Sequence, residues 1–166
     1  MMRESLYKAV KSSLKRVYET ETGYDRVKPG DEMPEDFVAA IRHIDLWNRN
    51  VEFAEQEEPW ERPAVFIEFA PVYWRRIKET MYRSEPFDVK LHIVTDWTGG
   101  MEPGQPEESC LKAFVLHQEI GAALEGLNGP WFDALELWAS HTNHDHEDLL
   151  ESIEVFRTRG YREVKK

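Results

Sequence analysis

The chain has 166 residues, and its 21 Lys and Arg against 32 Asp and Glu give a formal net charge of −11. This length suits a single domain with its own core, and 41% hydrophobic with 12% aromatic residues excludes an intrinsically disordered chain. The acidic charge argues against nucleic-acid wrapping as the main task, because phosphates are neutralised by clustered Lys and Arg. The single Cys110 excludes a disulfide framework and a cysteine-based zinc site.

No run of about eighteen apolar residues occurs, so no membrane-spanning segment is predicted. The first fourteen residues also lack the continuous apolar stretch of a secretory signal. We therefore expect one soluble, intracellular domain over residues 1–166.

Apolar residues at helical spacing predict an amphipathic helix over residues 5–18. They are Leu6, Val10, Leu14 and Val17. Residues 37–47 fit either a helix or a strand. Their apolar positions have helical spacing, which favours a helix. The segment 41–47, however, is short and contains β-branched side chains, which favours a strand. Periodicity alone does not decide between the two.

Acidic residues concentrate between Asp31 and Glu61, where ten of them are accompanied only by Arg42 and Arg49. We expect most of this charge on a solvated loop around residues 52–61.

Two strands are predicted after this loop. In the first, residues 63–74, Val65 and Ile67 share one face while Ala64 and Phe66 occupy the other, so both faces are expected to be covered. In the second, residues 87–93, apolar and polar side chains alternate, which predicts a half-exposed strand.

A second helix is predicted to begin at Pro106, with two glutamates in its first turn near the positive end of the helix dipole. Its expected buried stripe is Phe114, His117, Ile120, Leu124 and Leu127. Two final strands, 135–139 and 153–156, are expected to be joined by a hydrophilic turn over residues 141–148. The order predicts an α+β fold: a mostly antiparallel β-sheet with two main α-helices.

The densest polar cluster could bind zinc, nickel or manganese. It comprises His141, His144, Asp145, His146, Glu147 and Asp148. All these residues lie in one predicted turn, where His, Asn and Asp are common anyway, whereas metal ligands usually converge from separate elements. The turn interpretation is therefore favoured, and we expect no metal site.

Three single residues are candidates for a catalytic role. His117 could be a general base, but a satisfied core or interface histidine is the favoured interpretation. Cys110 near a helix start could be reactive, but without a histidine partner in the sequence it is expected to be a small apolar filler. Glu68, inside an apolar strand, is expected to face Arg75, Arg76 or a neighbouring subunit rather than to be a buried acid.

No phosphate-binding glycine loop occurs. With no paired nucleophile and base, no catalytic residue, no cofactor and no metal are expected, and the chain is not expected to be an enzyme. The basic C-terminal tail, residues 157–166, could contact nucleic acid or an acidic partner, although a solvated terminus is favoured.

The chain resembles the tail-terminator (minor tail) proteins of long-tailed bacteriophages and prophages. The resemblance runs through five segments taken in order, each of them weak alone. They are RHIDLWNRNVEF (42–53), PAVFIEF (63–69), VKLHIVTD (89–96), FVLHQEIGAALEGLNG (114–129) and SHTNHDHEDLLESIEVFRTR (140–159). Two departures from the family pattern occur: the acidic insertion at 52–61 is long, and residues 23–36 have no counterpart in it.

The resemblance implies an α/β sandwich with both helices on one face of the sheet, and a strand at 43–47. It further implies a virion protein that forms a ring, usually a hexamer, which caps the tail tube and joins it to the head connector. Its expected partners are other copies of itself, the tail-tube protein and the head–tail connector proteins, with DNA only as passing cargo and no membrane. Its expected location is the host bacterial cytoplasm during assembly and then the virion tail or neck.

Two other functions remain open from the sequence. One is a different phage neck or assembly module, such as a head-closure protein or tail chaperone. The other is a small metal-dependent hydrolase built on the His141–Asp148 cluster. A closed oligomer would favour the ring, and retained metal would favour the hydrolase.

Overall fold

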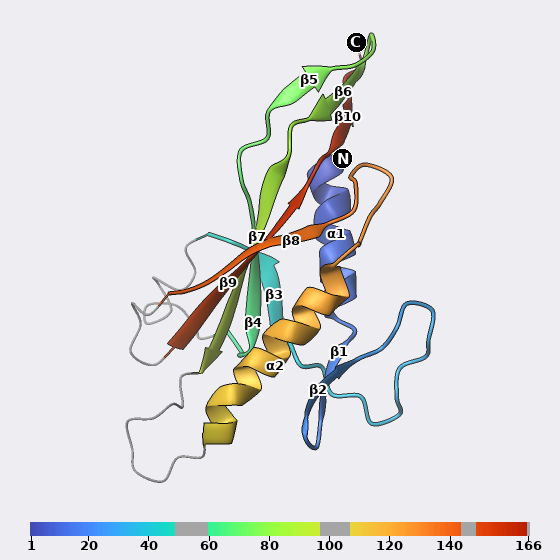
Figure 1. Cartoon of the computed structure of the whole chain (residues 1–166). Helices are drawn as coiled ribbons and strands as arrows, with labels where there is room; N and C mark the ends of the chain where they lie inside the picture. The colour runs from blue at the N-terminus through green and yellow to red at the C-terminus, as the bar shows by residue number, and fades with distance from the viewer. Residues whose placement is uncertain (49–59, 97–106, 144–148, 166) are drawn as a thin grey trace.

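The computed structural model describes residues 1–48, 60–96, 107–143 and 149–165, and the side chains of 107–110 are not described. Two helices and ten strands occur in this part of the chain (Figure 1). The helices are α1 (Met2–Leu14) and α2 (Glu107–Leu124). The strands are β1 (Val17–Thr20), β2 (Gly23–Arg26), β3 (His43–Leu46), β4 (Ala64–Phe69), β5 (Trp74–Arg76), β6 (Met81–Ser84), β7 (Phe87–Asp96), β8 (Glu136–Asn143), β9 (Leu149–Thr158) and β10 (Tyr161–Glu163).

The central sheet has five strands in the order β3-β4-β7-β9-β8. All neighbours are antiparallel except β3 and β4, which run parallel with His43 opposite Ala64. Both helices pack on the same face, where Leu6 of α1 and Ile120 of α2 join the core formed with Ile67 and Leu91 of the sheet. The α+β fold predicted from the sequence is therefore confirmed.

The strand β4 is an inner strand covered on both faces, as its sequence predicted, because Ala64, Val65, Phe66 and Ile67 are all buried. Val65 and Ile67 belong to the core under the helices, whereas Phe66 belongs to a second apolar cluster on the opposite face. Strand β7 is less exposed than its alternating sequence indicated. His92 and Val94, on the face opposite the helices, are buried as well.

The first helix is shorter than the predicted 5–18. It ends at Leu14, and Val17 and Tyr18 belong to β1, which pairs with β2 in a hairpin. The predicted helix was too long because Val17 is buried in the same core as Leu6, Val10 and Leu14 and continues their spacing, although it belongs to a strand. The undecided segment 37–47 contains a strand, β3, and residues 37–42 form no helix.

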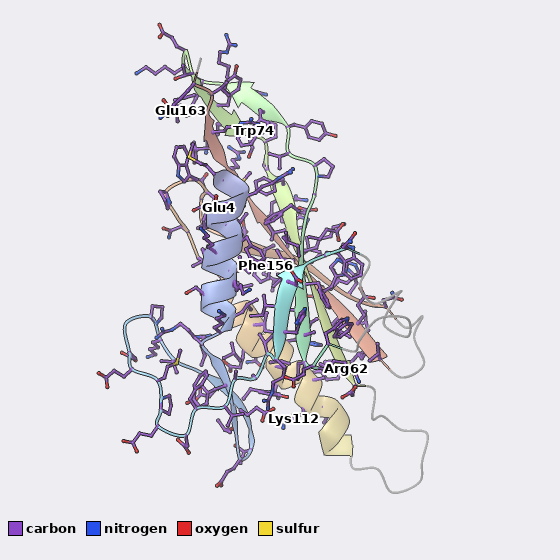
Figure 2. The ribbon with its side chains drawn as sticks, turned by 180° about the vertical axis from the view of Figure 1, so that it is seen from behind. Glu4, Arg62, Trp74, Lys112, Phe156 and Glu163 are labelled. Atoms are coloured by element: carbon purple, nitrogen blue, oxygen red, sulfur yellow. The ribbon has the colours of Figure 1, made fainter. Side chains whose placement is uncertain are left out.

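A second sheet of three strands, β10-β6-β5, projects from the body at one end (Figure 1). Trp74 lies near its base and Glu163 near its far end (Figure 2). The Ser84 N–H donates to the Gly160 carbonyl within this sheet, and the Tyr161 N–H donates to the Trp131 carbonyl, which holds the sheet to the body. The sequence analysis missed these strands, because they are short and polar and β10 pairs with a strand about 80 residues earlier.

The end of the chain also differs from the prediction. Strands β8 and β9 are longer than expected, and residues 141–143 belong to β8 rather than to a turn. The predicted stripe on α2 is partly wrong, since Phe114 is 57% exposed and Leu116 is buried instead. Neither helix in the described ranges has the length and apolar character that a membrane crossing requires.

Candidate functional site: the open edge of the sheet

Strand β8 forms an open edge of the central sheet. Among the residues that the structure describes it pairs only with β9, and every side chain from Glu136 to Thr142 is exposed. Leu137 and Trp138 are large apolar side chains on this exposed strand, and the guanidinium carbon of Arg157 lies 3.8 Å from the Trp138 ring centroid. An open strand of eight residues is a template to which another chain can add through backbone hydrogen bonds.

A groove of about 480 Å³ lies between this edge and helix α2. Its lining residues are His117, Gln118, Gly121, Ala122, Glu125, Leu137, Ser140 and Glu154. The Leu137 backbone N–H donates to Glu125 Oε2 at 2.8 Å, so the helix end satisfies one donor at the start of the edge strand. Beyond this contact, no strand in the described ranges other than β9 pairs with β8.

Two titratable groups in the groove are shifted by burial. Burial lowers the pKa of His117 to about 4, so its ring is neutral at neutral pH. Its Nε2 atom is buried and has no hydrogen-bond partner among the residues that the structure describes. Burial also raises the pKa of Glu154, although the hydrogen bond that it accepts from Ser140 Oγ acts in the opposite direction. The prediction was a satisfied core or interface histidine. His117 is only partly buried and its Nε2 atom has no hydrogen-bond partner among the described residues, so it is not a satisfied core histidine, and an interface role stays a prediction.

Ser140 and Glu125, two polar side chains of the groove, form hydrogen bonds with partners other than His117. Ser140 bonds to Glu154, and no hydrogen bond joins a hydroxyl or thiol to His117 among the described side chains. The lining of the groove combines small and apolar residues with polar ones. The former are Gly121, Ala122 and Leu137, and the latter are Gln118, Glu125, Ser140 and Glu154.

A buried polar network lies on the sheet face opposite the helices. His92 Nδ1 is 2.7 Å from Glu151 Oε1, and His92 Nε2 is 2.6 Å from Glu68 Oε2. Asn143 Nδ2 donates to Glu151 Oε2 at 3.0 Å. The Trp47 ring stacks on His92 with centroids 3.7 Å apart and planes 2° from parallel.

This network connects β4, β7, β9 and β8, and both nitrogens of its histidine are engaged. It therefore stabilises the sheet and leaves no free ring nitrogen to bind a metal or to act as a base. Glu68 faces His92 rather than Arg75 or Arg76, while the expected contact with a neighbouring subunit stays a prediction. The pairing joins residues 24 positions apart and has no signature in the sequence.

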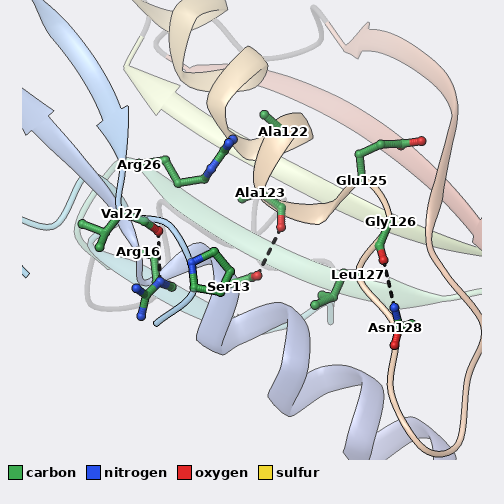
Figure 3. Close-up of a pocket in the computed structure, with 11 residues that line it drawn as sticks. Ser13, Arg16, Arg26, Val27, Ala122, Ala123, Glu125, Gly126, Leu127 and Asn128 are labelled. Atoms are coloured by element: carbon green, nitrogen blue, oxygen red, sulfur yellow. Dashed lines mark hydrogen bonds between the residues drawn. The ribbon is translucent and has the colours of Figure 1, made fainter. Parts of the chain in front are cut away.

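A second cavity, of about 330 Å³, lies where the ends of α1 and α2 meet β2 (Figure 3). Ser13 Oγ donates to the Ala123 carbonyl at 3.1 Å and Arg16 Nε donates to the Val27 carbonyl at 3.0 Å. Arg26 lies 3.8 Å from Glu119 across the same region. Most of its polar side chains thus bond to the protein itself, whereas the buried Arg26 Nη1 atom has no hydrogen-bond partner in the described part of the chain.

The structure describes only part of the remaining candidates. His141 is exposed on β8, while 144–148 lie outside the described residues, so the predicted cluster is described only at His141. Cys110 lies in the first turn of α2, but its side chain is outside the described part. Most of the predicted acidic loop, residues 52–59, also lies outside it. Within the described ranges no group of three or more His, Cys, Asp and Glu could hold a metal ion.

A comparison with protein-family models finds no match to this chain, and a comparison with curated proteins finds no similar sequence.

Proposed function

We propose that this protein is a structural subunit of a bacteriophage or prophage tail, of the tail-terminator type. In this role several copies form a ring, usually a hexamer, that caps the tail tube and joins it to the head connector. The protein would be made in the host bacterial cytoplasm and remain in the virion tail or neck. We propose no catalytic residue, cofactor or metal for it.

The observation that carries this proposal is the open edge at β8. A small protein usually protects a strand edge by shortening it, charging it or covering it. Here the edge is eight residues long, carries no Lys or Arg, and presents Leu137 and Trp138 to solvent beside a groove. Such an edge is suited to contact with another protein chain of an assembly.

Two further features support the proposal. The confirmed α+β fold, with both helices on one face of the sheet, is the architecture that the resemblance implies. The net charge of −11 suits a ring through which DNA passes, because an acidic surface repels phosphates and prevents adhesion.

The test is assembly of the purified protein on tail tubes, followed by negative-stain imaging and light scattering. We expect closed rings at the tube ends. Particles no larger than a dimer under every condition, including with tail tubes present, would contradict the proposal.

The contribution of the edge is tested by Thr142→Lys, which places a charge on β8. We expect the variant to fold normally but to bind tube ends or neighbouring copies more weakly, because an edge lysine opposes strand addition. The matched control is Ser12→Lys, the same kind of change at an exposed position of α1. Equal assembly of both variants would show that β8 lies outside the contact.

A further inference from the structure

We infer that the projecting three-stranded sheet of one copy docks on an acidic segment at the opposite end of another copy of this chain. This inference depends on one part of the proposed function, namely that copies of the chain associate with one another. We call the projecting part the basic arm, residues 71–86 and 159–165, and its proposed binding surface the acidic segment, residues 21–38.

The charge of the basic arm is opposite to that of the whole molecule. It carries seven Lys and Arg and three Glu, a net charge of +4, which leaves 14 basic and 29 acidic residues, or −15, on the remainder. Its basic residues are Arg75, Arg76, Lys78, Arg83, Arg159, Arg162 and Lys165. A cationic projection on a strongly acidic body favours contact with an acidic surface.

Several of these charges are free to bind a partner. Arg75 pairs with Glu85 at 2.8 Å, and Arg83 lies 3.3 Å from Asp133. By contrast, Lys78, Arg162 and Lys165 are exposed, and none of them forms an ion pair with any residue in the described ranges.

The basic arm also exposes apolar side chains among its charges. Tyr73 is 72% exposed, Ile77 is 55% exposed and Val164 is 42% exposed. Exposed aromatic and aliphatic groups interleaved with cations are the composition of a protein contact surface. We therefore expect the highest affinity for a partner surface that carries both apolar and acidic side chains.

The acidic segment offers this combination. It contains six acidic and two basic residues, and all six acidic side chains are exposed. They are Glu21, Asp25, Asp31, Glu32, Glu35 and Asp36. Met33 and Val38 lie among them and are 43% and 41% exposed.

Both surfaces are held in place before any contact forms. The Arg16 guanidinium donates to the carbonyls of Val27, Lys28 and Asp31, which fixes the middle of the acidic segment. The Glu19 N–H donates to the Val38 carbonyl, which fixes its end to β1. Preformed surfaces lose less conformational entropy on binding.

The two surfaces of one copy cannot reach each other. Met2, at the start of α1, packs near Gly160 at the base of the basic arm, whereas the acidic segment follows the opposite end of this helix (Figure 1). Thirteen helical residues separate these ends by about 20 Å. The basic arm must therefore contact a different molecule, and unlike patches that join successive copies generate rings when the rotation closes.

The test uses two charge-reversed variants at about physiological salt, where charges farther apart than about 8 Å are screened but contacting pairs still attract. The first is Lys78→Glu with Arg162→Glu in the basic arm, and the second is Glu32→Lys with Glu35→Lys in the acidic segment. We expect each alone to weaken self-association by on the order of tenfold or more, because like charges then meet. Sedimentation velocity over a concentration series measures this.

Mixing the two variants gives the decisive result. The reversed basic arm of the first is complementary to the reversed acidic segment of the second, so the mixture should regain the association of the unaltered protein. The control is Lys8→Glu with Lys15→Glu, which changes the net charge equally on the exposed surface of α1 and should weaken association far less. Recovery in the mixture cannot come from misfolding, since a misfolded chain would not regain binding.

Three results would overturn the inference. They are an unaltered protein that stays monomeric at every concentration, variants no weaker than the control, and a mixture that fails to recover. Loss of binding to labelled double-stranded DNA in the basic-arm variant, with self-association unchanged, would assign this surface to nucleic acid instead. Rings that still form on tail tubes despite both reversals would reject this contact while leaving the proposed ring function intact.

Discussion

At the residue scale, Phe66 shows how much one side chain of β4 contributes to stability. It is fully buried on the face opposite the helices, with ring centroids 5.0 Å from Trp60 and 6.2 Å from Trp47. Phe66→Ala should lower the free energy of unfolding by roughly 3–5 kcal/mol, because it removes a large aromatic and leaves a cavity. Urea titration measures this cost.

The control for that prediction is Phe114→Ala, the same change at a side chain that is 57% exposed on α2. It should cost less than about 1 kcal/mol, since little buried area is lost. A similar cost for both variants would show that the cluster around Phe66 contributes little to the core.

His117 makes stability depend on pH. Its pKa is about 4 in the folded protein but about 6.5 in an unfolded chain, so between these values the unfolded state binds more protons. Stability is therefore lost as the pH falls from about 6.5 to about 4, by at most roughly 3 kcal/mol. Urea titrations over this range should show a smaller loss for His117→Gln than for the unaltered protein.

Comparison with the variant is necessary because Glu154, in the same groove, has a raised pKa and contributes the opposite slope. A carboxyl that binds its proton more tightly when folded stabilises the protein as the pH falls. This contribution is present in both proteins and cancels in the difference. Identical pH profiles would show that His117 gains its proton equally well in the folded state.

At the element scale, the interior of α2 contains a glycine without a packing role. A Cβ atom built on Gly121 meets nothing within 4 Å, so no close approach of another element requires glycine there. Gly121→Ala should therefore stabilise the protein by roughly 0.5–1 kcal/mol, because alanine loses less backbone entropy in a helix. Thermal unfolding monitored by circular dichroism measures the gain.

The neighbouring Ala122→Gly is the matched reverse change at an exposed position of the same turn. It should lower stability by a similar amount. A destabilising Gly121→Ala would instead indicate that the groove beside β8 is tighter than the structure shows.

The same scale shows what the sequence could predict. Buried apolar residues on both faces predicted β4, and Pro106 with the apolar spacing predicted α2, because these signals are local. The hairpin β1–β2 was missed because Val17 prolongs a helical spacing, and β5, β6 and β10 were missed because they are too short to show a period. The network of Glu68, His92 and Glu151 depends on register between distant strands, which a single sequence does not reveal.

At the scale of the whole molecule, charge predicts an unusual dependence of self-association on salt. Two copies of net charge −11 repel at low salt, where the screening length is about 30 Å at 0.01 M. Association should increase up to physiological salt, where this length is about 8 Å, and decrease again near 1 M, where contacting pairs of opposite charge are screened too. Light scattering across this series should show a maximum.

A steady increase with salt would instead indicate a contact dominated by apolar groups, such as Leu137 and Trp138 of β8. A steady decrease would indicate that opposite charges dominate at every distance. Either profile would contradict the prediction that association has a maximum at intermediate salt.

The position of β9 has a consequence for how the protein is made. This strand lies between β7 and β8 in the central sheet, and it supplies Phe156 to the main core (Figure 2). On a ribosome adding roughly 5–20 residues per second, strand β7 must wait for several seconds with one unpaired edge until residue 158 emerges. Pairings so distant in sequence also close slowly. The nascent chain thus exposes one edge of the apolar strand β7 until β9 is made, and ribosome-associated chaperones are expected to be needed for its yield in the cell.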